Sequence, residues 1–217
     1  MPGRSDDSPN LLGKAKGIIL IMLAVFALSF GAGYAAGKLK IADIAKIRAS
    51  KLADLSRNLE TKVPVYGPLL QKYKTWERER LFGALAKTKI VKTMFTIFFN
   101  NWIMGNLTMS VRSAFLAPML LYPVGKFIQG LTFAQTRVTY QTWGMFLGEF
   151  GGYFLVICGT LCVVLWTLFY RKFRFSSRGA AFFDGLKVFF VLYLASGFIL
   201  LFSSYVETMS LVEMTIR

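Results

Sequence analysis

The feature that most constrains this chain is an uncharged apolar run of twenty residues, GIILIMLAVFALSFGAGYAA at 17–36. About 20 apolar residues in a helix are enough to cross the hydrocarbon core of a bilayer. Further apolar stretches follow at 93–110, 114–131, 143–170 and 183–206. The sequence therefore predicts an all-α fold: a polytopic transmembrane helix bundle of about five spans.

Composition supports a membrane class, because only 17% of the residues are charged whereas about a quarter are in soluble domains. We expect a polar N-terminus at 1–16, a first anchor at 17–36, a basic amphipathic region at 37–92, a bundle of about four helices at 93–206 and a C-terminal tail at 207–217. A cleaved signal peptide is the rival interpretation of the first run, but its apolar core would be shorter. Gly33 and Gly37 form a small-xxx-small pair on which another helix can pack closely.

The region 37–92 holds fourteen lysines and arginines against five acidic residues, in a chain of net charge +15. Apolar residues such as Ile41, Ile44 and Ile47 recur there at helical spacing, with cations between them, which predicts an amphipathic helix. Two interpretations stay open: a helix lying on anionic headgroups, or a soluble helical hairpin beneath the bundle. In the first, the lipid-facing cations are Lys38, Lys40, Lys46, Arg48 and Lys51. No nucleic-acid partner is expected, because no recognition motif accompanies the charge.

Orientation follows from where the cations gather, since the loops richest in Lys and Arg face the cytoplasm. Five spans with 37–92 inside place sixteen cations in the cytoplasm and eight outside. The basic loop at 171–178 then falls on the outer side. A single broken or re-entrant crossing at 93–131 would return that loop to the cytoplasm.

Polar groups inside the apolar segments are the candidate functional residues, because polar and ionisable side chains are costly in hydrocarbon. Asn100 and Asn101 lie in the second predicted span, either as a polar clamp between helices or on a ligand or ion path. Glu149 lies in GEFGGY and can pair with Lys126 or Arg112, or be protonated. Its neighbours Gly148, Gly151 and Gly152 offer a bare backbone face for helix packing.

The residue types present exclude most catalytic chemistry. Histidine is absent, which removes the usual general base and the commonest metal ligand. Cys158 and Cys162 share one face of a helix but are poorly placed for a disulfide and make an incomplete zinc site, so we expect them to pack in the core. No cofactor, metal or enzymatic activity is expected.

Four segments resemble the stage II sporulation protein M family of bacteria and archaea: FTIFFNNWIMGNLTM at 95–109, LLYPVGKFIQG at 120–130, FLGEFGGYFL at 146–155 and SYVET at 204–208. The most specific element is Phe99-Asn100-Asn101. The family motif on the fourth helix usually carries a histidine, which this chain lacks. The resemblance implies an integral protein of a prokaryotic plasma membrane.

Two functions follow as expectations. The resemblance implies a scaffold or subunit of a membrane complex, whose partners are the bilayer, its anionic headgroups and other membrane proteins or further copies of the chain. The alternative is a small permease or channel component, in which the intramembrane Asn and Glu side chains line a path for a solute or ion.

Overall fold

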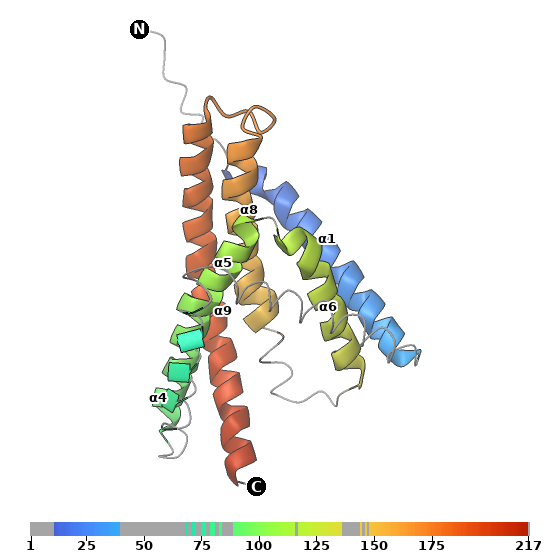
Figure 1. Cartoon of the computed structure of the whole chain (residues 1–217), viewed down its shortest axis with the longest axis vertical. Coiled ribbons are helices and arrows are strands. Elements are labelled where there is room, and N and C mark those ends of the chain that lie inside the picture. The colour runs from blue at the N-terminus through green and yellow to red at the C-terminus, as the bar shows by residue number, and fades with distance from the viewer. Residues whose placement is uncertain are drawn as a thin grey trace.

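The computed structural model describes residues 11–39, 89–115, 117–135 and 148–216, with single positions at 144, 146 and between 68 and 83. Its elements are α1 (Leu11–Lys38), α4 (Ile90–Phe99), η1 (Asn100–Gly105), α5 (Asn106–Ala114), α6 (Ala117–Gln135), η2 (Gly148–Tyr153), α8 (Phe154–Leu168) and α9 (Arg178–Ile216). All of these elements are helical, so the all-α prediction is confirmed over the described residues (Figure 1). The predicted basic region, including Lys40, Lys46, Arg48 and Lys51, lies largely outside them.

Three described helices are long and apolar enough to cross a membrane: Leu11–Lys38, Gly151–Leu168 and Arg178–Val212. They correspond to the predicted first, fourth and fifth spans. The helix α9 has 39 residues and is about 58 Å long at 1.5 Å per residue, whereas the hydrocarbon core is about 30 Å thick. One end of α9 must therefore extend beyond the bilayer. The spans at 93–110 and 114–131 stay predictions.

The region between 90 and 135 forms a helical hairpin. One continuous helical course runs through α4, η1 and α5, the chain turns near Phe115, and α6 runs back toward the same end of the bundle while diverging from α4 (Figure 1). The sequence also predicts a link at 111–113 between the spans at 93–110 and 114–131. That prediction is wrong, because these residues lie in the last turns of α5. The Ser113 Oγ donates a hydrogen bond to the Met109 carbonyl at 2.6 Å and stays within the helix.

The two prolines of this hairpin do not break α6. Pro118 occupies the first turn, where an amide N–H would have no intrahelical partner in any case. Pro123 lies inside the helix, which continues past it to Gln135. Both ends of the hairpin lie at the same end of the bundle (Figure 1).

The two ends of the bundle can be assigned to particular segments. The helix α6 packs in parallel against α1, with Phe127 beside Gly33 and Ala134 beside Gly37. At the start of α1 the Lys14 Nζ lies 3.8 Å from the ring centroid of Phe175 in the α8–α9 loop. That loop therefore lies at the opposite end of the described bundle from Lys38.

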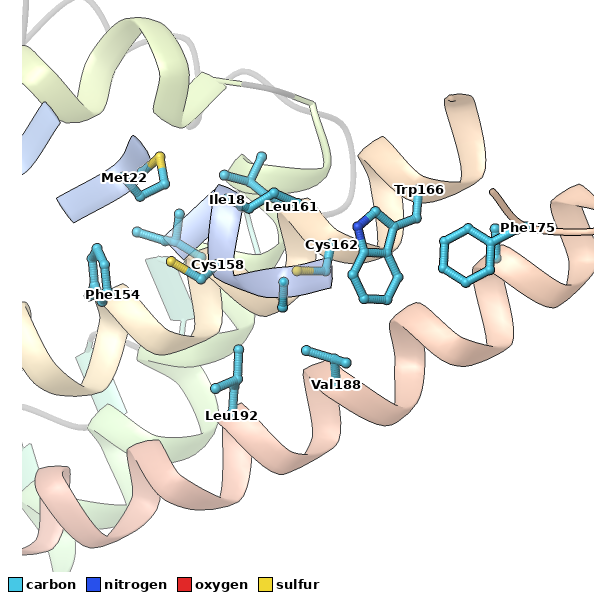
Figure 2. Packing of buried hydrophobic residues seen from close by; sticks show 13 residues of the cluster. Ile18, Met22, Phe154, Cys158, Leu161, Cys162, Trp166, Phe175, Val188 and Leu192 are labelled. Atoms are coloured by element: carbon cyan, nitrogen blue, oxygen red, sulfur yellow. The ribbon is translucent and has the colours of Figure 1, made fainter. Parts of the chain in front are cut away.

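The core lies where α1, α8 and α9 meet, and Figure 2 shows its side chains converging from these helices. Trp166 is fully buried at one end of this cluster, with its ring centroid 5.2 Å from that of Phe175. Cys158 and Cys162 are fully buried free thiols in the same cluster. Their position is the packing role expected from the sequence.

Burial of the two cysteines predicts that neither reacts with a polar maleimide in the folded protein, because the reagent must reach the sulfur atom. Both thiols should be labelled after denaturation in SDS. The measurement is the mass increase of the intact chain after brief labelling in mild detergent. Labelling at the same rate before and after denaturation would show that this helix contact is open.

Candidate functional site

The predicted asparagine pair lies on a π-helical turn, η1. Such turns close hydrogen bonds from residue i to i+5, and they occur frequently at functional sites. The Asn101 Oδ1 accepts a hydrogen bond from the Tyr153 hydroxyl at 3.2 Å. Tyr153 ends η2, so this bond joins the two π-helical turns of the described chain. A Cβ at Gly105 would collide with the Tyr153 ring, so the missing side chain makes room for it.

A second pair of hydrogen bonds joins η1 to α9. The Trp102 Nε1 donates to the Tyr193 carbonyl at 3.4 Å, and the Tyr193 hydroxyl donates to the Trp102 carbonyl at 3.0 Å. The indole lies against Gly197, where an added Cβ would be 2.8 Å from the Nε1. These two residues therefore exchange side-chain-to-backbone bonds across a tightly packed helix crossing.

Asn106 continues this contact one turn further along. Its Nδ2 donates to the Ser196 Oγ at 2.9 Å, and Ser196 donates its only hydroxyl proton to the Tyr193 carbonyl at 2.7 Å. The hydroxyl of Ser196 must therefore act as the acceptor for Asn106, which fixes the orientation of the amide. Asn106 is fully buried, and its Oδ1 has no hydrogen-bond partner in the described part of the chain.

We refer to Asn101, Trp102, Asn106, Tyr153, Tyr193 and Ser196 as the polar seam. It joins η1 and α5 to η2 and α9 through neutral amide, hydroxyl and indole groups. Sequence reasoning singled out Asn101 in the segment 93–110, which also holds Asn106, but it missed the other four. Tyrosine, tryptophan and serine give no signal in an apolar segment until the partner helix is known.

A double-mutant cycle tests whether the polar seam stabilises the bundle. Asn106→Ala, Ser196→Ala and the double variant should show a coupling energy of about 1 kcal/mol, within the range of interhelical hydrogen bonds in membranes. The measurement is the unfolding free energy in mixed SDS and mild-detergent micelles. Additive single-variant effects would show that this hydrogen bond does not contribute to stability.

The glycines near Glu149 pack against α9. A Cβ on Gly148 would lie 2.5 Å from the Ser203 Oγ, one on Gly151 2.6 Å from Ile199, and one on Gly152 2.5 Å from Leu200. The Ser203 Oγ also donates to the Gly144 carbonyl at 2.6 Å. The backbone of Glu149 lies in η2 between these glycines, and its side chain lies outside the described residues.

The pair Gly33 and Gly37 packs against α6 from the side of α1. A Cβ on Gly33 would collide with the Phe127 carbonyl, and one on Gly37 would be 2.6 Å from the Ala134 Cβ. In the reverse direction, a Cβ on Gly130 would collide with the Phe30 carbonyl. The helices α1 and α6 therefore approach almost backbone to backbone.

Lys126 of α6 is an ionisable side chain buried inside the bundle, 6% exposed. Its Nζ donates to the Gln129 Oε1 at 2.9 Å and lies 5.5 Å and 5.3 Å from the ring centroids of Phe26 and Tyr122. Aromatic faces attract cations, more strongly when water is excluded. Sequence reasoning considered Lys126 only as a partner for Glu149.

The arrangement of the described residues offers hydrogen bonds and one buried cation. No group of three or more His, Cys, Asp or Glu side chains that could hold a metal ion is found among them. Asn100 is partly buried at the start of η1, and Lys38 is exposed at the end of α1 with its Nζ 5.6 Å from the Tyr34 ring centroid.

Comparisons with known proteins identify no relative of this chain. No protein-family model matches the chain, and neither a curated protein nor a solved structure does. The class is defined by the helices themselves: three of them are long and apolar enough to cross a bilayer, as in α-helical membrane proteins.

Proposed function

We propose that this chain is a non-enzymatic scaffold or subunit of a membrane complex, in the plasma membrane of a prokaryote, with residues 37–92 in the cytoplasm. The observation that supports it most is the use of the intramembrane polar groups. Asn101, Asn106 and Ser196 form hydrogen bonds between helices. Such bonds hold a bundle in one arrangement and leave its outer faces for partners.

The glycine contacts support the same proposal. They bring α1 against α6, and η2 and α8 against α9, at distances that no larger residue permits. Close contact of this kind favours a bundle with one fixed packing, which suits a platform for other proteins. The resemblance to stage II sporulation protein M, through Phe99-Asn100-Asn101, favours the same class of function.

The outer faces supply surface for partners. Large apolar side chains on α9 are exposed, among them Phe190, Leu194 and Phe198 at spacings of four residues. The last ten residues of α9 add about 15 Å of helix beyond the apolar stretch that ends at 206. This extension lies at the same end as Lys38 (Figure 1), where the basic region begins.

Affinity purification of the tagged full-length chain in mild detergent, after cross-linking in native membranes, tests the proposal. We expect specific co-purifying membrane proteins or further copies of the chain. Phe198 is exposed on α9, so Phe198→Gln should lose the co-purifying proteins if they bind that face of α9. Leu20→Gln, at an exposed position on α1, is the control and should retain them. A wild-type chain that is a monomer without co-purifying partners would contradict the scaffold.

A permease or channel component is the second candidate, and two observations favour it. Lys126 is a buried cation in a bundle with little charge, and intramembrane ionisable residues often lie on substrate or ion paths. The Asn106 Oδ1 is a buried acceptor without a hydrogen-bond partner among the described residues, so it could receive a hydrogen bond or a cation.

If the chain is a permease or channel component, the flux of its ion or solute into liposomes should be lower in Lys126→Met and Glu149→Gln than in the wild type. Absence of flux in the wild type for every ion and small solute tested would reject this candidate.

A further inference from the structure

The end of the bundle opposite Lys38 is strongly cationic. Among the described residues, six basic side chains lie there: Lys14, Lys16, Arg171, Lys172, Arg174 and Arg178. The first two belong to the start of α1, and the others belong to the α8–α9 loop and the first residue of α9. The contact of Lys14 with Phe175 brings these two distant segments of sequence together. We refer to the six residues as the cationic end.

The charge of the cationic end is not compensated by acidic side chains among the described residues. None of the six side chains forms an ion pair with a carboxylate in the described part of the chain. The nearest acidic residue along α9, Asp184, is already paired with Lys187 at 2.7 Å. Like charges held close together repel one another, so this cluster is stabilised by an external anion.

The loop that displays these cations has a fixed conformation. The Phe175 N–H donates to the Tyr170 carbonyl at 2.9 Å and the Arg174 N–H donates to the Arg171 carbonyl at 3.1 Å, the pattern of a Schellman motif. Phe175 is buried against Trp166. The Ser177 Oγ caps α9 by accepting from the Ala180 N–H at 3.1 Å.

Two of the cations occupy positions that disfavour them. Arg174 has φ of 58°, a left-handed conformation usually taken by glycine. Arg178 is the first residue of α9, where the helix dipole repels a positive charge. Unfavourable local choices of this kind point to a function. An anion is attracted both to the guanidinium groups and to the positive end of the α9 dipole.

Exposed apolar side chains place the cationic end at the level of the lipid headgroups. Leu12, Phe169 and Phe183 are 60%, 53% and 65% exposed beside it. Aromatic side chains of membrane proteins gather at the boundary between hydrocarbon and headgroups. The Tyr170 ring, with Arg171 at 5.7 Å and Arg178 at 6.0 Å from its centroid, lies at this boundary as well.

We propose that the cationic end binds the phosphate groups of anionic phospholipids. This lipid contact is separate from that proposed for residues 37–92, because it lies at the opposite end of the described bundle from Lys38, where that region begins, and therefore in the other leaflet. It stabilises the α1 and α8–α9 contact by neutralising charges that have no carboxylate partner in the described part of the chain. Lipid binding also explains why the basic loop at 171–178 lies on the outer side in the predicted orientation, where Lys and Arg are usually fewer.

Lipid binding to the full-length protein in mild detergent tests this proposal, with native mass spectrometry as the readout. Phosphatidylglycerol and phosphatidylcholine are titrated separately against the wild type and the triple variant Arg171→Gln, Lys172→Gln, Arg174→Gln. We expect the wild type to prefer phosphatidylglycerol, and the affinity to fall about fivefold for each cation removed. The matched control is Arg137→Gln, Lys187→Gln, Arg217→Gln, which removes the same charge from positions outside both the cationic end and residues 37–92 and should leave phosphatidylglycerol binding intact.

Two outcomes would overturn the proposal. An equal loss of phosphatidylglycerol binding in both triple variants would show that net charge alone attracts the lipid. Competition by millimolar inorganic phosphate would show that the site takes free phosphate instead of a lipid headgroup. If the triple variant does not fold, Arg174→Gly provides the test, because glycine suits φ of 58° while removing the cation. Unchanged affinity in Arg174→Gly would also overturn the proposal.

Discussion

Gly33→Leu should destabilise the bundle by about 3 kcal/mol, near the upper end of the cost of overpacking. A Cβ at Gly33 meets the main chain of Phe127, and a backbone atom cannot rotate away as a side chain can. The helix α1 must therefore move away from α6, and the neighbouring contacts of Gly37 and Gly130 are lost with it. The measurement is the unfolding free energy in mixed SDS and mild-detergent micelles.

The matched control lies two residues earlier on the same helix. Gly31 has no atom within 4 Å of its added Cβ, so Gly31→Leu should change the unfolding free energy by no more than about 0.5 kcal/mol. Both variants add the same side chain to α1, so the change in helix propensity is closely matched. Equal stability of the two variants would show that α1 and α6 do not pack as described.

Trp166→Ala should cost about 3–5 kcal/mol, the range for removing a large aromatic side chain from a core. Trp166 is completely buried and packs on both Phe173 and Phe175. Its removal leaves a cavity and also loosens the loop that carries the cationic end. Thermal unfolding followed by near-ultraviolet circular dichroism provides the measurement.

A conservative substitution separates packing from hydrogen bonding at this position. The Trp166 Nε1 is buried without a hydrogen-bond partner in the described part of the chain, so Trp166→Phe gives up no polar contact there and should cost less than about 1.5 kcal/mol. Phe169, 53% exposed beside it, provides a surface comparison as Phe169→Ala. A loss of stability as large in Phe169→Ala as in Trp166→Ala would contradict the assigned core.

Helical class and three of the spans were predictable because each depends on local sequence. A run such as 17–36 must form a helix in lipid, where its backbone groups have no other partner. The helix boundaries were less predictable. The link expected at 111–113 is helical. The Ser113 hydroxyl donates a hydrogen bond to the Met109 carbonyl of the same helix, so this polar side chain is compatible with a helix and does not require a loop.

The candidate site was predictable only in part. Asn101 could be singled out because an amide in an apolar segment needs a partner, but its partner Tyr153 is 52 residues away. A glycine pair in the sequence shows where another helix can pack closely, but it does not identify that other helix. The structure assigns Gly33 to α6 and Gly148 to α9, and these assignments depend on the path of the whole chain.

The sequence by itself determined that this chain forms membrane-spanning helices and has no histidine chemistry, because hydrophobicity and residue type act without reference to the fold. Only the tertiary structure decided that 90–135 reverses as a hairpin and that Lys14 meets Phe175. It also showed that Lys126 is buried and that Asn106 bonds to Ser196. These features arise from contacts between segments distant in sequence, and local pattern does not specify which segments meet.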